Sequence, residues 1–263
     1  MKTIAVTNQK GGVGKTTTSV NLAASLATTR RKVLLIDIDP QGNATMACGV
    51  DKNAVPATIC EVLLGESSLS DARCTLSEYG FDLIASNSDL TAAEVDLMQV
   101  TQREQRLRQA LDTVRDQYEY VIIDCPPSLN MLTLNALVAA NSVLIPMQCE
   151  YFALEGLTAL LQTVEKVKAT VNPELHIEGL LRTMFDPRNN LAQDVSEQLK
   201  IHFQDRLYRT IIPRNVRLAE APSHGIPVIQ YDKTSRGALA YLALAGEILR
   251  RDAKLRHDQE LSV

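Results

Sequence analysis

A glycine-rich turn near the N-terminus constrains the fold more than any other part of the sequence. It covers residues 8–17 and reads N-Q-K-G-G-V-G-K-T-T. The apolar run at 3–7 before it is typical of a buried strand, and the small-residue segment at 18–27 after it is typical of a helix. A strand, a glycine-rich turn and a helix in this order form the context that a phosphate-binding loop requires.

The residue types in this turn suit phosphate binding. Glycines let the backbone approach an anion and direct N–H groups at it, and a helix N-terminus adds free donors and the positive end of its dipole. Lys15 is expected to reach the β- and γ-phosphates, and the Thr16 hydroxyl is expected to bind Mg²⁺. The nucleotide-binding residues predicted in the turn are Lys10, Gly11, Gly12, Val13, Gly14, Lys15, Thr16 and Thr17.

The turn departs from the standard phosphate loop in two ways. The standard pattern has a glycine six residues before its lysine, where this chain has Gln9, and the turn holds a second lysine, Lys10. A loop that already has Lys15 does not need another cation from the same chain. We therefore expect Lys10 to reach a phosphate bound by a second subunit, like an arginine finger, which predicts an ATP-dependent sandwich homodimer. The alternative is a solvated surface lysine.

Strands and helices are expected to alternate along the whole chain. This alternation predicts an α/β fold, with a doubly wound, mostly parallel sheet flanked by helices. One phosphate-loop domain is expected to span residues 1–263, and residues 252–263 are expected to form a frayed tail. Further strands are predicted at 33–36, 80–85, 120–124, 142–146, 175–181 and 208–212, and helices at 90–98, 102–117, 130–139, 154–171, 189–204 and 235–251.

Three aspartates end or follow predicted strands, at the edge of a parallel sheet where ligands bind. Asp124 is expected to act as a Walker-B carboxylate that holds Mg²⁺ directly or through water. The turn at Pro40 is expected to aim Asp39 at the γ-phosphate, where it would orient the attacking water, and Asp37 is assigned to the outer shell of the metal. The alternative for each is an ordinary loop carboxylate or a helix cap. The predicted catalytic residues are Lys10, Lys15, Asp39 and Asp124, and the predicted metal residues are Thr16, Asp37 and Asp124.

The sequence indicates less clearly which base the nucleotide carries. The guanine-reading pattern N-K-x-D does not occur, which favours adenine and therefore ATP. Asn215, which follows Pro213 at a strand end, could hydrogen-bond the adenine edge, and Met184 with Phe185 could pack on its face. Each of these residues alone is more typical of a structural position.

Net charge, cysteine content and the length of apolar runs limit the partners and the cellular location that we expect. The net charge of −4 argues weakly against nucleic acid as a partner, although a local basic face remains possible. The five cysteines have no C-x-x-C and no metal-ligand spacing, so we expect them to be reduced. The first strand begins at once, which leaves no signal peptide, and no apolar run approaches the roughly 18 residues of a membrane span. We expect a cytoplasmic protein.

Five segments resemble the ParA/Soj family of chromosome-partitioning ATPases, which has a deviant Walker A loop. The resemblance implies a weak ATPase whose ATP-bound dimer binds double-stranded DNA non-specifically and associates with the nucleoid. It also implies a ParB/Spo0J-type partner that stimulates hydrolysis and releases the DNA, and it matches Arg188 and Arg217 to DNA-binding arginines. The dimer would bring two basic faces together, so the negative net charge of the chain would not prevent DNA binding. The five segments are 7–23, 35–45, 121–129, 149–157 and 212–228.

The sequence disfavours several functions of related ATPases. MinD-type membrane cycling is disfavoured because residues 252–263 lack an apolar face. Nitrogenase iron protein is disfavoured because Cys125 has no second cysteine in a matching context. A carboxylate-activating ligase ranks last, since no substrate loops stand out. The main alternative is a positioning ATPase that uses the same dimer switch to recruit a protein cargo.

Overall fold

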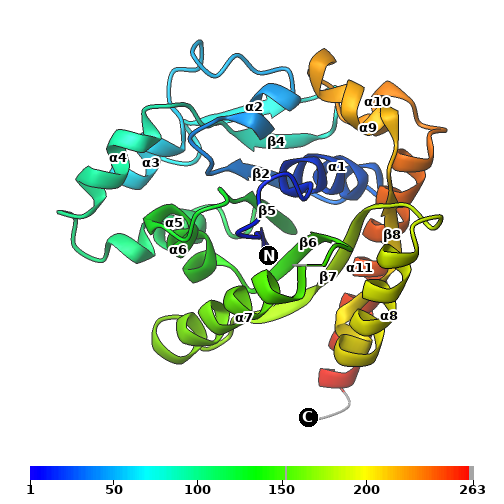
Figure 1. Ribbon diagram of the computed structural model, residues 1–263. Helices are drawn as coiled ribbons and strands as arrows, with labels where there is room; N and C mark the ends of the chain where they lie inside the picture. The colour runs from blue at the N-terminus through cyan, green and yellow to red at the C-terminus, as the bar shows by residue number, and fades with distance from the viewer. Residues whose placement is uncertain (152, 261–263) are drawn as a thin grey trace.

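The computed structural model describes residues 1–151 and 153–260, which form an eight-stranded sheet with helices on both faces (Figure 1). The strand order is β3-β4-β2-β5-β1-β6-β7-β8, and every neighbouring pair is parallel except β3 with β4. This arrangement confirms the predicted fold class. The strands are β1 (Lys2–Val6), β2 (Val33–Asp37), β3 (Arg73–Leu76), β4 (Phe81–Ile84), β5 (Tyr120–Asp124), β6 (Ser142–Gln148), β7 (His176–Phe185) and β8 (Leu207–Pro213).

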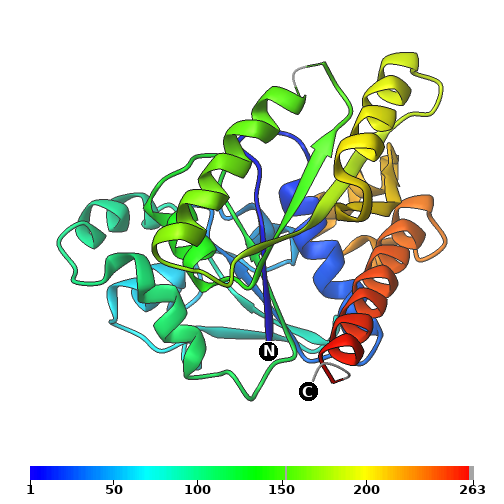
Figure 2. The same ribbon diagram turned by 90° about the horizontal axis from the view of Figure 1, so that it is seen from below.

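The helices divide into two groups, one on each face of the sheet (Figures 1 and 2). On one face lie α1 (Lys15–Thr28), α2 (Asn43–Ala47), α9 (Val216–Glu220), the 3₁₀ turn η3 (Ala221–His224), α10 (Val228–Tyr231) and α11 (Arg236–Glu260). On the other lie α3 (Ile59–Leu64), α4 (Leu90–Leu97), α5 (Arg106–Asp112), α6 (Met131–Ala139), α7 (Ala153–Thr170) and α8 (Asn190–Phe203). Two further 3₁₀ turns are η1 (Arg103–Gln105) and η2 (Gln204–Arg206).

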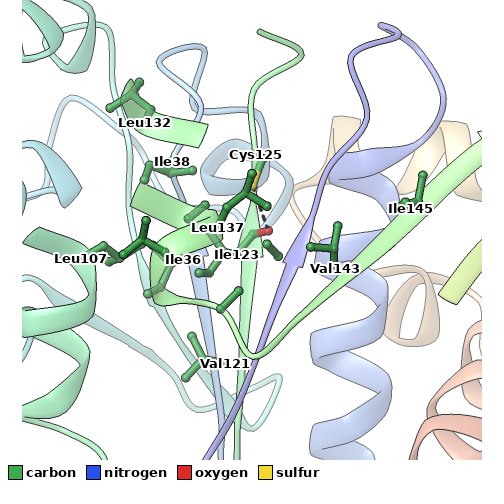
Figure 3. Close-up of a cluster of buried hydrophobic side chains, with 14 of the residues drawn as sticks. Ile36, Ile38, Leu107, Val121, Ile123, Cys125, Leu132, Leu137, Val143 and Ile145 are labelled. Atoms are coloured by element: carbon green, nitrogen blue, oxygen red, sulfur yellow. Dashed lines mark hydrogen bonds between the residues drawn. The ribbon is translucent and has the colours of Figure 1, made fainter. Parts of the chain in front are cut away.

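Successive residues of the central strands pack into different cores, because side chains alternate across a sheet. In β2, Leu34 and Ile36 belong to the core under α3–α8, whereas Val33 and Leu35 belong to the core under α1 and α11. Figure 3 shows part of the first core, where Ile36 lies among apolar side chains from β5 and α6. Covering both faces explains why these strands read as continuous apolar runs.

Some predicted elements differ in length from those in the structure. The helix predicted at 102–117 is shorter in the structure: Gln102 has a positive φ of 54°, a 3₁₀ turn follows it, and only Arg106–Asp112 is α-helical. Strand β7 continues to Phe185, past the predicted end at 181, because its pairing with β6 extends through Thr183 and with β8 to its last residue.

The C-terminal helix also runs further than predicted. It was expected to end near residue 251, but α11 continues to Glu260, and residues 261–263 lie outside the described part of the chain. Asp252 explains the extension, because its buried carboxylate accepts hydrogen bonds from the Lys2 ammonium and from Tyr120 Oη (2.6 Å).

Lys2 also pairs with Glu178 (2.8 Å), which accepts a further bond from Ser142 Oγ (2.7 Å). We call Lys2, Glu178 and Asp252 the amino-edge cluster. It joins the start of β1 to the last turns of α11 (Figure 2).

The strand register determines what meets at the opposite, carboxyl edge. β1 lies between β5 and β6, so its end is the point where the chain order of the sheet reverses, and ligands bind at such points. Val6, the last residue of β1, is aligned with Asp124, and Asp37 is aligned with Asp124 from the other side. Among the described helices, none combines the length and the apolar composition needed to cross a membrane.

Candidate active site

The glycine-rich turn connects β1 to α1 at this carboxyl edge. Gly12 and Gly14 have φ values of 74° and 87°, a backbone conformation that costs glycine little and other residues more. Gly14 is the N-cap residue of α1 and has no side chain to cap the helix, so the first N–H groups of α1 remain available to a ligand. The turn therefore has the backbone geometry of an anion site.

The ends of β6 and β7 hold the turn in place. The Asn8 amide donates to the Pro146 carbonyl (2.8 Å) and accepts from the Lys10 backbone N–H (3.0 Å). Further along the turn, Gln148 Nε2 donates to the Gly12 carbonyl (3.3 Å) and Thr183 Oγ1 donates to the Val13 carbonyl (2.8 Å). Because side chains from two strands satisfy these carbonyls of the turn, the carbonyls do not compete with an anion for its N–H groups.

Lys15 lies inside the site, with only 8% of its surface exposed. Its ammonium donates to the Lys10 carbonyl (3.3 Å). Burial lowers the pKa of Lys15, and the nearby Asp124 carboxylate opposes that shift only in part. A buried cation whose charge is incompletely compensated attracts an anionic ligand.

Asp124 is fully buried and accepts two hydroxyl hydrogen bonds from α1, from Thr16 Oγ1 (2.8 Å) and from Ser19 Oγ (2.8 Å). Burial raises the pKa of the Asp124 carboxyl, and its register neighbour Asp37 adds to the increase. A divalent cation would relieve this accumulation of negative charge. The Asp124 carboxylate and the Thr16 hydroxyl, adjacent oxygen donors beside a phosphate site, fit Mg²⁺, which binds one or two carboxylates together with substrate phosphates.

Asp37 is also fully buried, but its oxygens are engaged by the protein. One accepts from the Thr45 backbone N–H and hydroxyl (both 2.8 Å), and the other accepts from the Asp39 N–H (3.1 Å). Burial raises the pKa of Asp37, although these hydrogen bonds oppose the shift. The carboxylate thus fixes the start of α2 and the backbone of Asp39, so any contribution to a metal is indirect.

Asp39 follows β2 and lines the largest cavity at this edge. It is 8% exposed, its carboxylate accepts from the Gln41 N–H (3.0 Å), and Ser86 Oγ donates to its carbonyl (2.7 Å). The backbone on both sides of this carboxylate is therefore fixed by hydrogen bonds. A fixed carboxylate at the wall of the cavity is suited to orienting a water molecule.

This cavity has a volume of about 700 Å³. Of the predicted base-binding residues, only Met184 lines it. Asn215 instead caps α9 by accepting from the Arg217 N–H (3.0 Å), and Pro213 pairs in register with Phe185. The lining residues are Gly11, Gly12, Gly14, Lys15, Thr16, Thr17, Val20, Asn21, Asp39, Gln41, Asn43, Met46, Ala47, Pro127, Met184, Ala221, Pro222, Ser223, Ile226 and Pro227.

Several of these residues were missed by the sequence reasoning. The most informative are in the segment 221–227, which forms the wall of the cavity beyond the loop. Its prolines and glycine are the signal of a rigid turn, but they carry no mark of a ligand. Ser19 was missed because its hydroxyl acts on Asp124 rather than on the cavity.

Lys10 is exposed and lies beside the site rather than inside it. Its ammonium forms an ion pair with Glu150 (2.5 Å), which follows the end of β6, and the two side chains are 44% and 51% exposed. Its trans role therefore stays a prediction, and Glu150 is a partner that the sequence did not reveal.

Arg188 and Arg217 lie beyond the carboxyl ends of β7 and β8. Arg188 donates from Nε and Nη2 to both oxygens of Asp186 (2.9 and 2.8 Å), and its side chain is 88% exposed. Arg217 pairs with Glu220 (2.7 Å) and approaches Asp232 (3.5 Å). Both arginines are available at the surface, and each is partly neutralised by its own chain.

Comparisons with known proteins agree with this geometry. A family model described as an AAA domain matches residues 1–177. The chain is 53% identical over 247 residues to the sporulation initiation inhibitor protein Soj of Bacillus subtilis, covering 94% of this chain and 98% of Soj. It is 48% identical over 254 residues to the chromosome partitioning protein ParA of Caulobacter vibrioides, covering 96% and 95% of the two chains.

A solved structure extends the similarity to the fold and the ligand. It is a cobyrinic acid a,c-diamide synthase from Mycobacterium smegmatis with a bound ATP analogue and magnesium. It is 38% identical to this chain, with a TM-score of 0.82, and the match covers 98% of this chain and 96% of that one.

Proposed function

Because the chain belongs to the ParA/Soj family of chromosome-partitioning ATPases, we propose that it hydrolyses ATP to switch a pair of subunits between DNA-bound and free states. The observation that carries the proposal is the pair of lysines in one turn, with Lys15 buried in the cavity and Lys10 exposed beside it. In this cycle, ATP-bound subunits form a sandwich homodimer. A ParB/Spo0J-type partner stimulates hydrolysis, and the DNA is then released.

The residues of the cavity divide the reaction between them. Lys15 and the N–H groups of the turn neutralise the phosphates, and Asp39 orients the attacking water. Asp124 and the Thr16 hydroxyl hold Mg²⁺, while Asp37 keeps the backbone of Asp39 in place. Magnesium, when bound, offsets the charge that develops on the phosphate oxygens.

DNA binding is assigned to the surface that carries Arg188 and Arg217. Binding without sequence preference relies on neutralising backbone phosphates with basic side chains. A dimer presents two copies of each arginine to the same DNA molecule. Once one subunit is bound, the other is held close to the DNA, so the affinity of the dimer is more than twice that of one subunit. The ATP-driven step therefore controls DNA binding through the number of subunits that act together.

A gel-shift assay tests the proposal. Wild-type protein is expected to retard linear duplex DNA with an ATP analogue but not with ADP, and Arg217→Ala is expected to weaken that binding about tenfold or more. Arg31→Ala is the matched control, since Arg31 pairs with Glu119 at 2.7 Å and is similarly exposed (43% against 46%). DNA binding that ignores the nucleotide, or that Arg31→Ala weakens equally, would contradict the proposal.

Two other functions make predictions that differ from those of a partition ATPase. A positioning ATPase that recruits a protein cargo predicts an ATP-dependent dimer whose DNA binding is independent of both arginines. The second alternative is a synthase, and the observation in its favour is the 38% identity to a cobyrinic acid a,c-diamide synthase. It predicts that ADP release requires a carboxylic acid substrate and a nitrogen donor, whereas a partition ATPase releases ADP with its partner and DNA alone.

A further inference from the structure

Both lysines of the turn are engaged by acceptors within the chain. The Lys15 ammonium donates to the Lys10 carbonyl (3.3 Å), and the Lys10 ammonium pairs with Glu150 Oε2 (2.5 Å). Lys10 thus takes part in both contacts, through its backbone in one and its side chain in the other. Two cations proposed to bind phosphates therefore each have an internal partner.

Glu150 is positioned by the same segment that holds the turn. It lies two residues beyond Gln148, whose side chain donates to the Gly12 carbonyl, and its backbone N–H donates to the Gln148 carbonyl (3.0 Å). On the other side of the pair, the Lys10 backbone N–H is bonded to the Asn8 side chain. With both backbones restrained, the pair opens by movement of the two exposed side chains, and the Lys10 ammonium can then meet another anion.

We propose that Glu150 is an intramolecular counter-ion that retains Lys10 in the nucleotide-free subunit and must release it before Lys10 can reach a phosphate bound by a second copy of the chain. This inference rests on the trans role of Lys10 in the proposed function. Glu150 competes with the partner's nucleotide for one ammonium, so it opposes dimer formation. It does not line the 700 Å³ cavity, so it leaves nucleotide binding within the subunit unchanged.

The size of the effect follows from the exposure of the pair. An ion pair as accessible as this one changes an equilibrium by roughly twofold to fivefold. A symmetric dimer contains two such pairs, and both must open. The free-energy terms add, so the factors multiply, and the dissociation constant of the dimer is raised by about fourfold to 25-fold.

The decisive experiment compares the dimer dissociation constants of wild type and Glu150→Gln by analytical ultracentrifugation with saturating non-hydrolysable ATP analogue. Glu150→Gln is expected to lower the constant by about fourfold to 25-fold. Glu197→Gln is the matched control, because it removes an ion pair of the same length (2.5 Å) with Lys200 on α8 and is expected to change nothing. An unchanged or raised constant for Glu150→Gln would overturn the inference.

A double-mutant cycle identifies the partner. Lys10→Ala removes the trans contact together with the ion pair, so its dimer is expected to be weak, and adding Glu150→Gln is expected not to strengthen it, since no ammonium remains to be released. If the substitution acts equally in both backgrounds, Glu150 does not work through Lys10 and the inference fails. A wild type and Glu150→Gln that both remain monomeric would overturn the trans role itself, whereas a normal wild-type dimer that Glu150→Gln does not tighten overturns only the role of Glu150.

Discussion

The two edges of the sheet each bury a cluster of charges, and the clusters differ in balance. At the amino edge, burial alone would raise the pKa of Glu178, but Lys2 and the Ser142 hydroxyl hold it below its ordinary value. At the carboxyl edge, burial raises the pKa of Asp124 and Asp37, and the attraction between Lys15 and Asp124 offsets only part of the cost of burying Lys15. The first cluster is complete within the chain, whereas the second gains stability from an added cation and an added anion.

This difference separates structural from functional charge. A buried carboxylate with a lowered pKa already has its partners and contributes to folding. Buried carboxylates with raised pKa values persist at a cost to the fold, and such groups are concentrated where a ligand supplies the missing charge. Substitutions at the two edges should therefore produce opposite effects on binding and on stability.

The largest expected effect is the loss of nucleotide binding in Lys15→Ala. Removing the buried cation leaves the phosphates without their main partner, and affinity for ATP should fall roughly a thousandfold, about 4 kcal/mol. Isothermal titration calorimetry measures it. Lys52→Ala is the control, since Lys52 also donates to a backbone carbonyl, that of Gln41 (2.7 Å), but does not line the cavity. Equal losses in both variants would remove Lys15 from the site.

At the amino edge, Lys2→Met should cost about 3 kcal/mol of stability, because it leaves Glu178 and Asp252 buried without their cation. Urea unfolding measures the loss, and nucleotide affinity should stay within about twofold of wild type. Lys200→Met breaks an exposed pair and is expected to change stability by less than about 0.5 kcal/mol. A defect in nucleotide binding without a loss of stability would contradict the division between the edges.

Asp124→Asn should have two opposite consequences. It removes a carboxylate whose ionisation is opposed by burial, so the nucleotide-free protein should gain about 2 kcal/mol of stability at pH 8, while ATP turnover should fall by 10²-fold or more, as roughly expected for a lost metal ligand. Thermal unfolding and ADP release measure the two effects. A variant that is both less stable and fully active would reverse the assignment.

The Asp124 carboxylate also makes the stability of the folded chain depend on pH. The folded-state pKa of Asp124, raised to about 8, exceeds the ordinary carboxyl value, so the folded chain binds more protons than the unfolded chain between about pH 4 and 8. Its contribution to stability is present below this window and is lost as the pH rises to about 8. Unfolding of nucleotide-free wild type should show this loss, and Asp124→Asn should reduce it. An identical pH profile for the two proteins would contradict the raised pKa.

The smallest expected effect lies outside both clusters. Asp186 pairs with Arg188 in solvent, and Asp186→Asn should tighten ATP-dependent DNA binding by about twofold because it frees the guanidinium for phosphate. Filter binding at several salt concentrations measures the change. Glu197→Gln, which also removes a carboxylate from an exposed ion pair but leaves Arg188 paired, controls for general loss of negative charge. Weaker DNA binding in Asp186→Asn would show that Asp186 instead holds Arg188 in its binding position.

The carboxyl edge could be predicted from sequence because its signals are local. The turn at 8–17 and the aspartate that ends β5 each occur within one strand–turn–helix pattern, at 2–28 and 120–139, typical of a phosphate site. The pairing of Asp37 with Thr45 was not predicted, because it depends on how α2 packs after β2. Asn215 and Pro213 were expected at the base, but the chain turns after β8 and the segment 221–227 lines the cavity instead.

The amino-edge cluster left no signal that sequence reasoning could use. Lys2 and Asp252 are separated by 250 positions, and a lysine or an aspartate near either end reads as an ordinary surface charge. The same contact extends α11 past its predicted end, where the polar composition indicated a tail. Long-range pairing, rather than local propensity, determines this part of the fold.

The contact between β1 and α11 also has a consequence for the order of assembly. The strand that ends in the phosphate-binding turn is synthesised well before its amino-edge partner Asp252, since 250 positions separate Lys2 from Asp252. Chains are made at about 5–20 residues per second, so the central strand waits for many seconds before its neighbours on both sides and the final helix have emerged. Nascent chains on the ribosome therefore cannot complete the nucleotide pocket early, and a truncated product lacking the last helix would expose apolar surface of α1 that Tyr241 and its neighbours normally cover.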